Sequence, residues 1–448
     1  MASEVDSIRL RELSVRITKG TTPTKGEGFV ARGVNYIKSE SITSDGSIDA
    51  SKFAFIDEKT HDKLARSQLR AGNVLFSMAG VYLGKTAIVL PEHLPANTNQ
   101  AVGIITLDES KADPHFIHYS LQSPACRAWV MRSAAQSAQP NFNLQEIGDL
   151  KIPALPLAKQ KEIARVLRVL DDRIDNLRQT NATLEFIAQA LFKSWFIDFD
   201  PVRAKAEGRE PEGMNAETAG LFPDAFEDSE LGEIPKGWKV QRLGDVVQRI
   251  TKGTTPTTLK RPFVPSGINF VKVESISDDG ELLSEKFAYI DDETHSLLQR
   301  SQLEVGDVLI TIAGTIGRTA IVTEDFLPAN TNQAVALIRP NSGNISSGFI
   351  CRFLGRKDSR QAMSERVVQA VQANLSLGTL SDLRLTIPPH DLAERLYGAA
   401  IRPIDDAKAW NSQRVRTLSA LRDALLPRLI SGQLRLSEAE AQLNEALA

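Results

Sequence analysis

The chain has 448 residues, of which 42% are hydrophobic and 24% are charged. This composition is typical of globular proteins, and the length predicts two to four domains. Because there is no run of 18 apolar residues, no apolar N-terminal segment and only two cysteines, we expect no membrane span, no secretory signal and a cytoplasmic location.

The net charge of −3 is distributed unevenly along the chain. Residues 205–233 carry nine acids and two bases, and residues 437–448 carry three more acids. The remainder therefore has a net charge of +7, which permits binding to a polyanion without requiring it.

The sequence is internally duplicated. ITKGTTPT begins at residues 17 and 250, and LPANTNQAV begins unchanged at residues 94 and 327, an offset of 233 in both cases. NYIKSESI at residue 35 returns as NFVKVESI at residue 269, an offset of 234. A repeat of this length is far longer than a solenoid repeat, so the chain contains two copies of a domain-sized unit.

Residues 1–156 form the first globular domain. Short β-like runs alternate with turns rich in Gly, Pro and Asn and with a few helical stretches, which predicts a mixed α/β (α+β) fold. One turn looks like a nucleotide-binding loop, but only three residues separate Gly80 from Gly84, and a P-loop needs four. The second copy has two residues between Gly314 and Gly317 and an arginine in place of the lysine. We therefore interpret both glycine pairs as tight turns and not as an NTPase site.

Residues 157–199 are expected to contain a long helix. Residues 157–195 lack proline and glycine, and their apolar residues follow the 4-3 spacing of a coiled-coil seam. Asn181 is the polar exception, of the kind that fixes the register of paired helices. A core helix of a bundle is the alternative. The predicted seam residues are Ile163, Leu167, Leu170, Ile174, Leu177, Asn181 and Leu184.

The second half repeats this order. An acidic linker rich in Pro and Gly, residues 200–236, is expected to lie along the surface. It precedes the second globular domain, residues 237–390, the second coiled-coil helix, residues 391–432, and a C-terminal tail, residues 433–448.

Two prolines, Pro403 and Pro427, should kink the second helix or shorten its ends. One seam in each half predicts an intramolecular antiparallel pair of long helices with a globular domain at each end, related by a pseudo-two-fold axis. The predicted seam residues of the second helix are Ile401, Ile404, Val415, Leu418 and Leu425.

Three strings resemble the specificity (S) subunits of type I restriction–modification enzymes. They are LFKSWFIDFDPVRAKAEGREPEGM from Leu191, SELGEIPKGW from Ser229 and ALLPRLISGQL from Ala424. The repeated GTTP, the IPALPLAKQKEIARVL segment from Ile152 and the two-copy layout fit the same family, so the resemblance covers nearly the whole chain. The second helix departs from the pattern, because IPPHDLAERL from Ile387 lacks the usual Glu-Gln pair, and we expect its partner contacts to differ in detail.

The resemblance implies a subunit without catalytic activity of its own. Each globular domain would be a target-recognition domain that reads one half of a bipartite DNA sequence. The helices would set the unread spacer and dock two adenine methyltransferase subunits, and motor-nuclease restriction subunits would join them. S-adenosylmethionine, ATP and Mg would be bound by those partner subunits. Because the two domains share identical runs, we expect similar half-sites in inverted orientation.

Several polar residues are candidates for DNA contact. Turns that carry hydroxyls and a cation suit contacts with DNA phosphates. Amide side chains suit the edge of adenine, and cationic side chains suit guanine. For each residue the alternative is a solvated surface position or a turn-capping role. The segments Lys25–Val34 and Thr258–Ile268, where the copies diverge most, should account for differences between half-sites. The candidates are Lys19, Thr21, Thr22, Lys25, Arg32, Lys38, Lys85, Asn97, Asn99, Gln100, Asn141 and Asn143 in the first copy, and Lys252, Thr254, Thr255, Lys260, Arg261, Lys272, Arg318, Asn330, Asn332, Gln333, Gln372 and Asn374 in the second.

The histidines give no metal-binding pattern. His61 and His295 follow acids that are expected to cap a helix start, and His115 and His118 are interpreted as surface residues. We find no Asn-Pro-Pro-aromatic methyltransferase motif and no nuclease constellation, so we expect neither catalysis nor a metal. A scaffold protein that does not bind DNA, with duplicated modules on a coiled coil, stays open as the alternative function.

Overall fold

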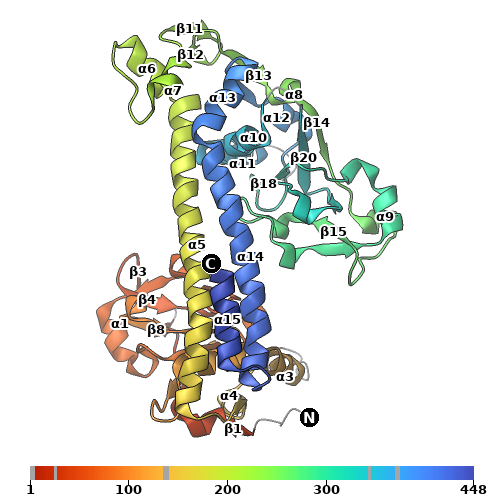
Figure 1. Cartoon of the computed structure of the whole chain (residues 1–448). Coiled ribbons are helices and arrows are strands. Elements are labelled where there is room, and N and C mark those ends of the chain that lie inside the picture. Colours follow the sequence, from red (N-terminus) through yellow and green to blue (C-terminus); the bar gives the residue numbers. More distant parts are fainter. Residues whose placement is uncertain (1–5, 25–27, 135–140, 342–344, 369–373, 448) are drawn as a thin grey trace. The chain divides into compact units, whose positions relative to one another are not determined.

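The computed structural model describes residues 6–24, 28–134, 141–341, 345–368 and 374–447. The chain divides into two compact units (Figure 1): unit 1 comprises Met1–Leu177 and Gln413–Ala448, and unit 2 comprises Arg178–Ser412. Two helices, α5 (Leu157–Phe196) and α14 (Arg402–Ile430), contribute residues to both units.

Unit 1 is built around two four-stranded sheets and one two-stranded pair. Its strands are β1 (Ser7–Arg9), β2 (Ser14–Lys19), β3 (Phe29–Val30), β4 (Val34–Ile37), β5 (Ala54–Ile56), β6 (Val74–Ser77), β7 (Thr86–Ile88), β8 (Ala96–Thr98), β9 (Val102–Leu107) and β10 (Lys151–Pro153). The order β2-β9-β6-β7 is antiparallel throughout, whereas the order β3-β5-β4-β8 contains one parallel pair, β4 with β8. Its shorter helices are α1 (Glu58–Lys63), α2 (Pro114–Gln122), α3 (Pro124–Ala134), α4 (Leu144–Gly148) and α15 (Leu436–Leu447).

The central strands of unit 1, β6 and β9, are mostly apolar because both of their faces are covered. In β6, Val74 and Phe76 belong to the core that includes Phe116 of α2, whereas Leu75 belongs to the core that includes Ile37 of β4. Successive side chains of a strand point to opposite faces. The β2-β9-β6-β7 sheet is therefore the middle layer between the helices and the second sheet.

Unit 2 repeats this architecture. Its strands are β11 (Phe226–Ser229), β12 (Gly232–Pro235), β13 (Lys239–Arg242), β14 (Val247–Lys252), β15 (Ile268–Val271), β16 (Ala288–Ile290), β17 (Val308–Thr311), β18 (Thr319–Ile321), β19 (Ala329–Thr331), β20 (Val335–Pro340) and β21 (Arg384–Ile387). The orders β14-β20-β17-β18 and β16-β15-β19 match the two sheets of unit 1 except at β3. Its helices are α6 (Asp200–Ala206), α7 (Ala216–Gly220), α8 (Leu243–Val246), α9 (Asp292–Leu297), α10 (Ser347–Gly355), α11 (Lys357–Val368), α12 (Leu377–Ser381) and α13 (His390–Ala400), with parts of α5 and α14. The predicted fold class, a mixed and internally duplicated α/β fold, is confirmed.

The structural difference between the copies lies in the divergent segments. In unit 1 this segment contains strand β3, which pairs with β5. In unit 2 the corresponding segment begins within a 3-10 helix, Pro256–Leu259, makes an isolated bridge from Val264 to Tyr289 and ends at the first residue of β15.

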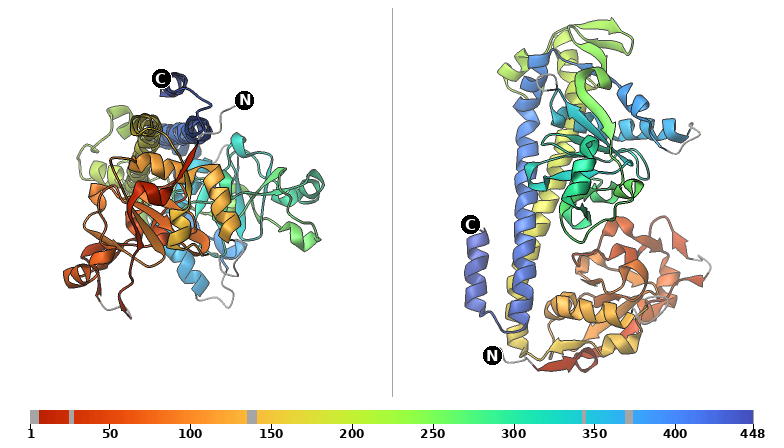
Figure 2. Two further views of the ribbon diagram at one scale, coloured as in Figure 1. Left: turned by 90° about the horizontal axis from the view of Figure 1, so that it is seen from below. Right: turned by 90° about the vertical axis from the view of Figure 1, so that its right-hand side faces the viewer.

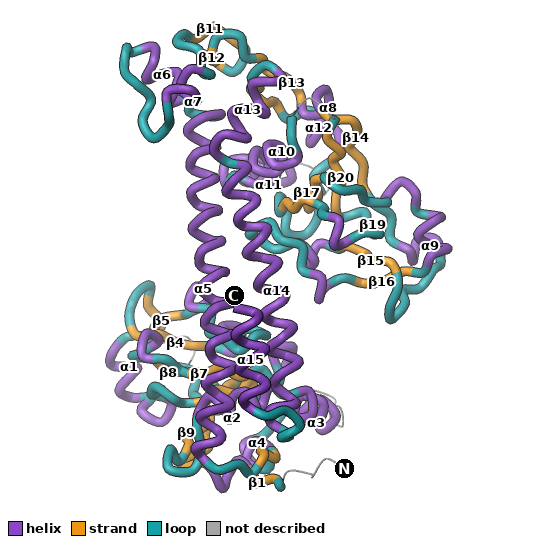
Figure 3. Tube along the Cα trace, in the orientation of Figure 1, coloured by secondary structure: helices purple, strands orange, loops and turns teal. Residues whose placement is uncertain are grey.

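The two long helices pair in antiparallel orientation, as predicted, and α5 is continuous (Figure 3). In unit 2, Asn411 donates to the carboxamide oxygen of Asn181 (2.9 Å), and Lys408 pairs with Glu185. Partner numbers fall along α14 as they rise along α5, which defines the antiparallel direction. The predicted seam residues lie on the buried side of the helices. The buried ones are Ile163, Leu167, Leu170, Ile174, Leu177, Ile401, Leu418 and Leu425, and the half-buried ones are Asn181, Leu184, Ile404 and Val415.

The second helix is interrupted where the sequence suggested. Helix α13 ends at Ala400 and α14 begins at Arg402, so Pro403 lies in the first turn of α14, where its missing N–H costs nothing. Pro427 lies inside α14 and does not end it.

The two segments interpreted as linker and tail are both folded. Residues 200–236 form α6, α7 and the β11–β12 hairpin, and Val202 and Phe222 are buried in the core of unit 2. The acidic tail forms α15, which lies alongside α14 in unit 1 (Figure 2) and buries Ala439 and Leu443. Both segments were assigned from their net negative charge, although the spacing of their apolar residues is sufficient for packing into a core.

A repeat-related carboxylate connects each globular domain to the helix pair. In unit 1, Asp171 of α5 accepts from the hydroxyl of Tyr119 in α2 and pairs with Arg422 of α14 at 2.8 Å. In unit 2, the equivalent Asp405 pairs with Arg352 of α10. Each domain is therefore held to its helices by a hydrogen-bonded charge as well as by apolar contacts.

His118 was interpreted as a surface residue, which is wrong. It is only 6% exposed and hydrogen-bonds through Nδ1 to the hydroxyl of Thr86 (3.2 Å). Burial, followed by the nearby charges of His115, Arg422 and Arg127, lowers its pKa to about 3. The imidazole is thus held neutral inside unit 1.

Unit 1 should lose stability as the pH falls from about 6.5 towards 3. The unfolded chain binds a proton at His118 near pH 6.5, whereas the folded chain does not until about pH 3, so acid favours unfolding. By pH 5 this amounts to a loss on the order of 2 kcal/mol. Thermal unfolding of the wild type and of His118→Gln at pH 7.5 and 5.0 measures this loss of stability. Between the two pH values, the wild type should lose more stability than the variant. An equal loss in both proteins would show that His118 is not the responsible group.

Candidate nucleic-acid interface

Two turns that were predicted separately lie together in each unit. In unit 1, the Thr22 hydroxyl donates to Gln100, and the backbone N–H of Thr21 donates to the carbonyl of Thr98 (3.0 Å). In unit 2, the Thr255 hydroxyl donates to Gln333. The GTTP and NTNQ motifs therefore form one continuous surface, here called the turn surface.

Glycine is required for this close approach. A Cβ on Gly20 would lie 2.2 Å from the carbonyl oxygen of Thr98, and a Cβ on Gly253 would lie 1.8 Å from that of Thr331. Both distances are far below van der Waals contact, so any other residue would separate the two turns. The glycine of GTTP thus has a structural reason that is independent of any ligand.

The turn surface presents a similar set of groups in both units. Lys19, Thr22, Gln100, Lys252 and Gln333 are exposed. Those that are half-buried are Thr21, Asn99, Thr254, Thr255 and Asn332. The carboxamide oxygens of Asn99 and Asn332 accept from the backbone two residues further on, at 3.2 and 3.1 Å, so these amides also cap the turn.

Two of the amide candidates must be corrected. Asn97 and Asn330 have no exposed surface, and their side chains hydrogen-bond inside the protein. Asn97 donates to the carbonyl of Leu64 and to the hydroxyl of Ser67, both at 3.2 Å. A residue in this position cannot reach a base edge, so its role is internal.

Several candidate cations are already paired with carboxylates. Lys38 pairs with Glu40 (3.2 Å) and Lys272 with Glu274 (2.7 Å). Arg318 makes a bidentate contact with Asp278, at 2.7 and 3.0 Å. Arg261 pairs with Glu293, and Lys85 lies over the ring of Tyr82, 5.1 Å from its centroid.

Arg32 and Lys260, both in the divergent segments, are exposed. Lys260 has a left-handed backbone with φ of 55°, which ends the preceding 3-10 helix and turns the chain. Lys25 and Gln372 lie outside the described residues.

The amides before the long helices have mixed placements. Asn141 and Asn374 are exposed, and Asn141 bridges to Ala79. Asn143 caps α4 by accepting from the backbone N–H groups of Gln145 and Glu146, both at 2.9 Å. Its main role is therefore to start that helix.

The acids before the two histidines cap helices as predicted. Asp57 accepts from the N–H of Thr60, and Asp291 from that of Thr294, each at 2.7 Å.

Sequence reasoning missed Tyr36, whose hydroxyl donates to the carbonyl of Thr21 (2.9 Å) and supports the turn surface from beneath. Burial raises the pKa of Tyr36, so the phenol stays protonated as a donor.

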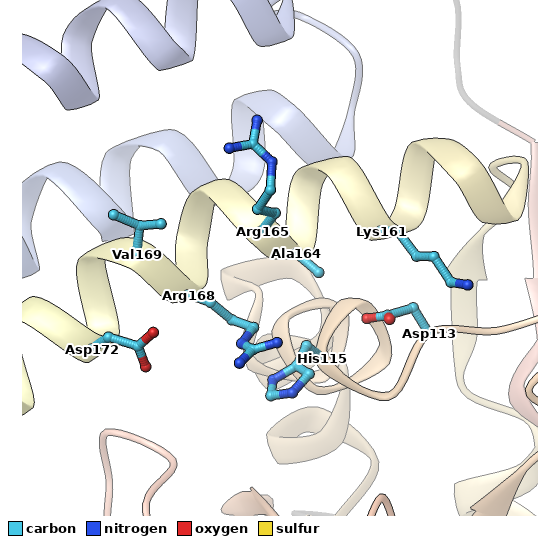
Figure 4. A pocket seen from close by; sticks show the side chains of 8 residues that line it. All are labelled: Asp113, His115, Lys161, Ala164, Arg165, Arg168, Val169 and Asp172. Atoms are coloured by element: carbon cyan, nitrogen blue, oxygen red, sulfur yellow. The ribbon is translucent and has the colours of Figure 1, made fainter.

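A separate cavity of about 400 Å³ lies between the start of α2 and α5 in unit 1 (Figure 4). Arg168 points toward the ring of His115, and burial together with this arginine lowers the pKa of that histidine. The lining residues are Asp113, His115, Lys161, Ala164, Arg165, Arg168, Val169 and Asp172. Arg165 forms an ion pair with Glu440 of α15.

Among the described residues, no cluster of histidine, cysteine and carboxylate side chains could hold a metal ion, and no helix within those ranges is long and apolar enough to cross a membrane.

Comparison with known proteins gives a consistent result. The family model described as "Type I restriction modification DNA specificity domain" matches residues 2–186 and 235–395. The chain is similar to the type I restriction enzyme HindI specificity subunit of Haemophilus influenzae, with 26% identity over 66% of this chain and 71% of that protein. It is also similar to the MjaIX specificity subunit of Methanocaldococcus jannaschii, with 26% identity over 77% of this chain and 74% of that protein.

A solved structure supports the fold. The type I restriction–modification S subunit from M. genitalium aligns with a TM-score of 0.50 and 15% identity, covering 95% of this chain and 96% of that one. The family model covers more than half of the chain and matches each copy of the repeat separately. The chain therefore belongs to the family of type I restriction–modification DNA specificity subunits.

Proposed function

We propose that this chain selects the DNA target of a type I restriction–modification complex, with each unit reading one half of a bipartite sequence. The observation that carries the proposal is the turn surface, which is built twice from the same hydrogen bonds. Exposed lysine and threonine at this surface suit phosphate contacts, and exposed amides suit base edges. The chain contributes recognition and no catalytic step.

The long helices are proposed to set the spacer between the half-sites and to dock two adenine methyltransferase subunits. Helix α5 has 40 residues and is therefore about 60 Å long, comparable to the rise of about 18 base pairs. S-adenosylmethionine would be bound by the methyltransferase subunits, and ATP and Mg by motor-nuclease restriction subunits. The proposed location is the cytoplasm, where the host DNA is.

The divergent segments are proposed to decide which bases each unit prefers. The turn surface is common to both units, so it supports two similar half-sites in inverted orientation. The segments Lys25–Val34 and Thr258–Ile268 differ in sequence and, where described, in structure. They lie in the second sheet or directly before it.

Replacing Lys25–Val34 with Thr258–Ile268 should change the half-site read by unit 1 and leave the other half unchanged. One base contact discriminates by about 1–3 kcal/mol, so preference should move by about tenfold or more at the affected base pairs. The measurement is genome-wide mapping of methylated adenines in a host that coexpresses the variant with its methyltransferase partner. The reciprocal replacement is the matched control, and it should change only the half read by unit 2.

Two outcomes would contradict this assignment. If both replacements leave the methylated sequence unchanged, base preference does not depend on these segments. If the wild-type chain directs no methylation to a bipartite sequence, the proposed function itself is wrong.

A further inference from the structure

A buried carboxamide holds an imidazole in the same way in both units. Asn97 hydrogen-bonds to Nδ1 of His61, and Asn330 hydrogen-bonds to Nδ1 of His295. Both asparagines are fully buried, whereas both histidines are partly exposed. The pair thus connects the protein interior to the surface at α1 and at α9.

The hydrogen bonds define the tautomer of each histidine. In unit 1, Nδ2 of Asn97 donates to the carbonyl of Leu64 (3.2 Å), and a carbonyl can only accept. The carboxamide oxygen of Asn97 is therefore the atom that faces His61, and the imidazole must donate to it from Nδ1. In unit 2, Asn330 donates to the carbonyl of Leu298 (3.1 Å), which gives His295 the same tautomer.

This tautomer leaves Nε2 as a hydrogen-bond acceptor directed away from the interior. The two ring nitrogens lie on different sides of the imidazole, and Nδ1 points at a fully buried group. Neither Nε2 atom makes a hydrogen bond to the described residues. Neither is buried, because neither is one of the buried side-chain atoms that lack a hydrogen-bond partner. With its hydrogen on Nδ1, each ring offers the lone pair of Nε2 to solvent from a fixed position.

The imidazole of unit 1 lies between the turn surface and the divergent segment. Asn97 lies in strand β8, which ends at Thr98, and Gln100 of the turn surface follows two residues later. On the other side, the N–H of Asp57 at the start of α1 donates to the carbonyl of Gly28 (2.9 Å), and Thr60 packs under the same glycine.

The charges of α1 do not select a phosphate, because the exposed Glu58 and Asp62 offset the exposed Lys59 and Lys63. Glu58 begins α1, and Asp292 begins α9, and both side chains are exposed. An imidazole nitrogen that carries no hydrogen cannot donate a hydrogen bond to a phosphate. An amino group of a base suits this acceptor, and in the major groove only adenine N6 and cytosine N4 supply one.

We propose that His61 and His295 are specificity-determining residues, each accepting a hydrogen bond at Nε2 from the amino group of an adenine or cytosine in its own half-site. Asn97 and Asn330 are the positioning residues that hold each ring in the accepting tautomer. This inference rests on the proposed function. It adds a reading position outside the divergent segments and the turn surface.

The test uses the full chain coexpressed with its methyltransferase partner. His61→Phe keeps the ring shape and removes the acceptor, so preference at one base pair of the unit 1 half-site should fall about tenfold. His295→Phe should do the same in the other half only, and His61→Gln should retain part of the preference because its Oε1 can accept. Lys19→Ala is the control, since loss of a phosphate contact should weaken binding to all sequences uniformly.

Unchanged base preference in both Phe variants, or a uniform loss like that of Lys19→Ala, would overturn the inference while leaving the proposed function intact. Absence of any bipartite target in the wild type would instead reject the proposed function. A second measurement does not depend on folding of the variants: in the wild-type complex, Nε2 carbethoxylation of His61 and His295 is followed by peptide mass spectrometry. A target duplex should protect both histidines more strongly than a non-target duplex does, and equal modification would overturn the assignment.

Discussion

Leu170→Asp is expected to destabilise unit 1 by about 4 kcal/mol or more. Leu170 has no exposed surface and lies in the same apolar core as Leu425 of α14. Removing a buried leucine already costs about 2–5 kcal/mol, and the new carboxylate would be buried without a partner. The neighbouring Asp171 uses Arg422, so that cation does not compensate the second charge.

Hydrogen–deuterium exchange of the full chain measures this effect locally. Peptides from residues 157–177 and from 413–430 should lose protection in Leu170→Asp, while strand peptides of unit 2 keep it. Arg173→Asp is the matched control, because Arg173 is exposed on the same helix and surface substitutions usually change stability by less than about 0.5 kcal/mol. Equal protection in Leu170→Asp and wild type would contradict a helix pair with a buried seam.

Arg352→Met is expected to destabilise unit 2 by about 3 kcal/mol, since breaking a buried ion pair leaves its partner uncompensated. The Arg352 side chain is 7% exposed and contacts Glu185 of α5 at 3.2 Å and Asp405 of α14. Burial opposes the charge on Arg352, but Asp405 and Glu185 outweigh it and raise its pKa. Burial likewise disfavours the charge on Glu185, yet Arg352 and Lys408 lower its pKa.

Chemical denaturation, followed through the unit 2 tryptophans, measures the loss. Arg402→Met is the control, because its ion pair with Glu394 is largely exposed and such pairs contribute about 0–1 kcal/mol. Similar midpoints for the two variants would show that the Arg352 network does not hold α10 to the helices.

The helices were predictable because their signal is local and repeated. The seam positions from Ile163 to Leu184 follow a 4-3 spacing, and the stretch 157–195 without proline or glycine nearly coincides with α5. The break before Arg402 was anticipated from Pro403, since a proline in the first turn of a helix removes no helical hydrogen bond. Helix α15 was missed, because its acidic net charge outweighed the spacing of Leu436, Ala439 and Leu443.

The candidate interface was only partly predictable, because a polar side chain does not reveal its partner. The motifs around Thr22 and Gln100 were recognised separately, but their contact depends on the sheet topology that brings the two turns together. Asn97 was assigned to a base edge because amides suit adenine, whereas the fold satisfies it with Leu64 and Ser67. A histidine recurring 36 residues before the asparagine in one copy and 35 in the other was the available signal for their pairing.

The repeat-related carboxylates Asp171 and Asp405 set a condition for recombination between genes of this kind. Tyr119 and Arg352 occupy equivalent positions in α2 and α10, yet one presents a phenol and the other a full positive charge to its carboxylate. A crossover between a recognition domain and its helix would combine a donor from one parent with an acceptor network from the other. The resulting chimaera would carry a surplus or a deficit of one buried charge. We therefore expect an exchanged recognition domain to remain stable when the donor residue and its helix partners are inherited together.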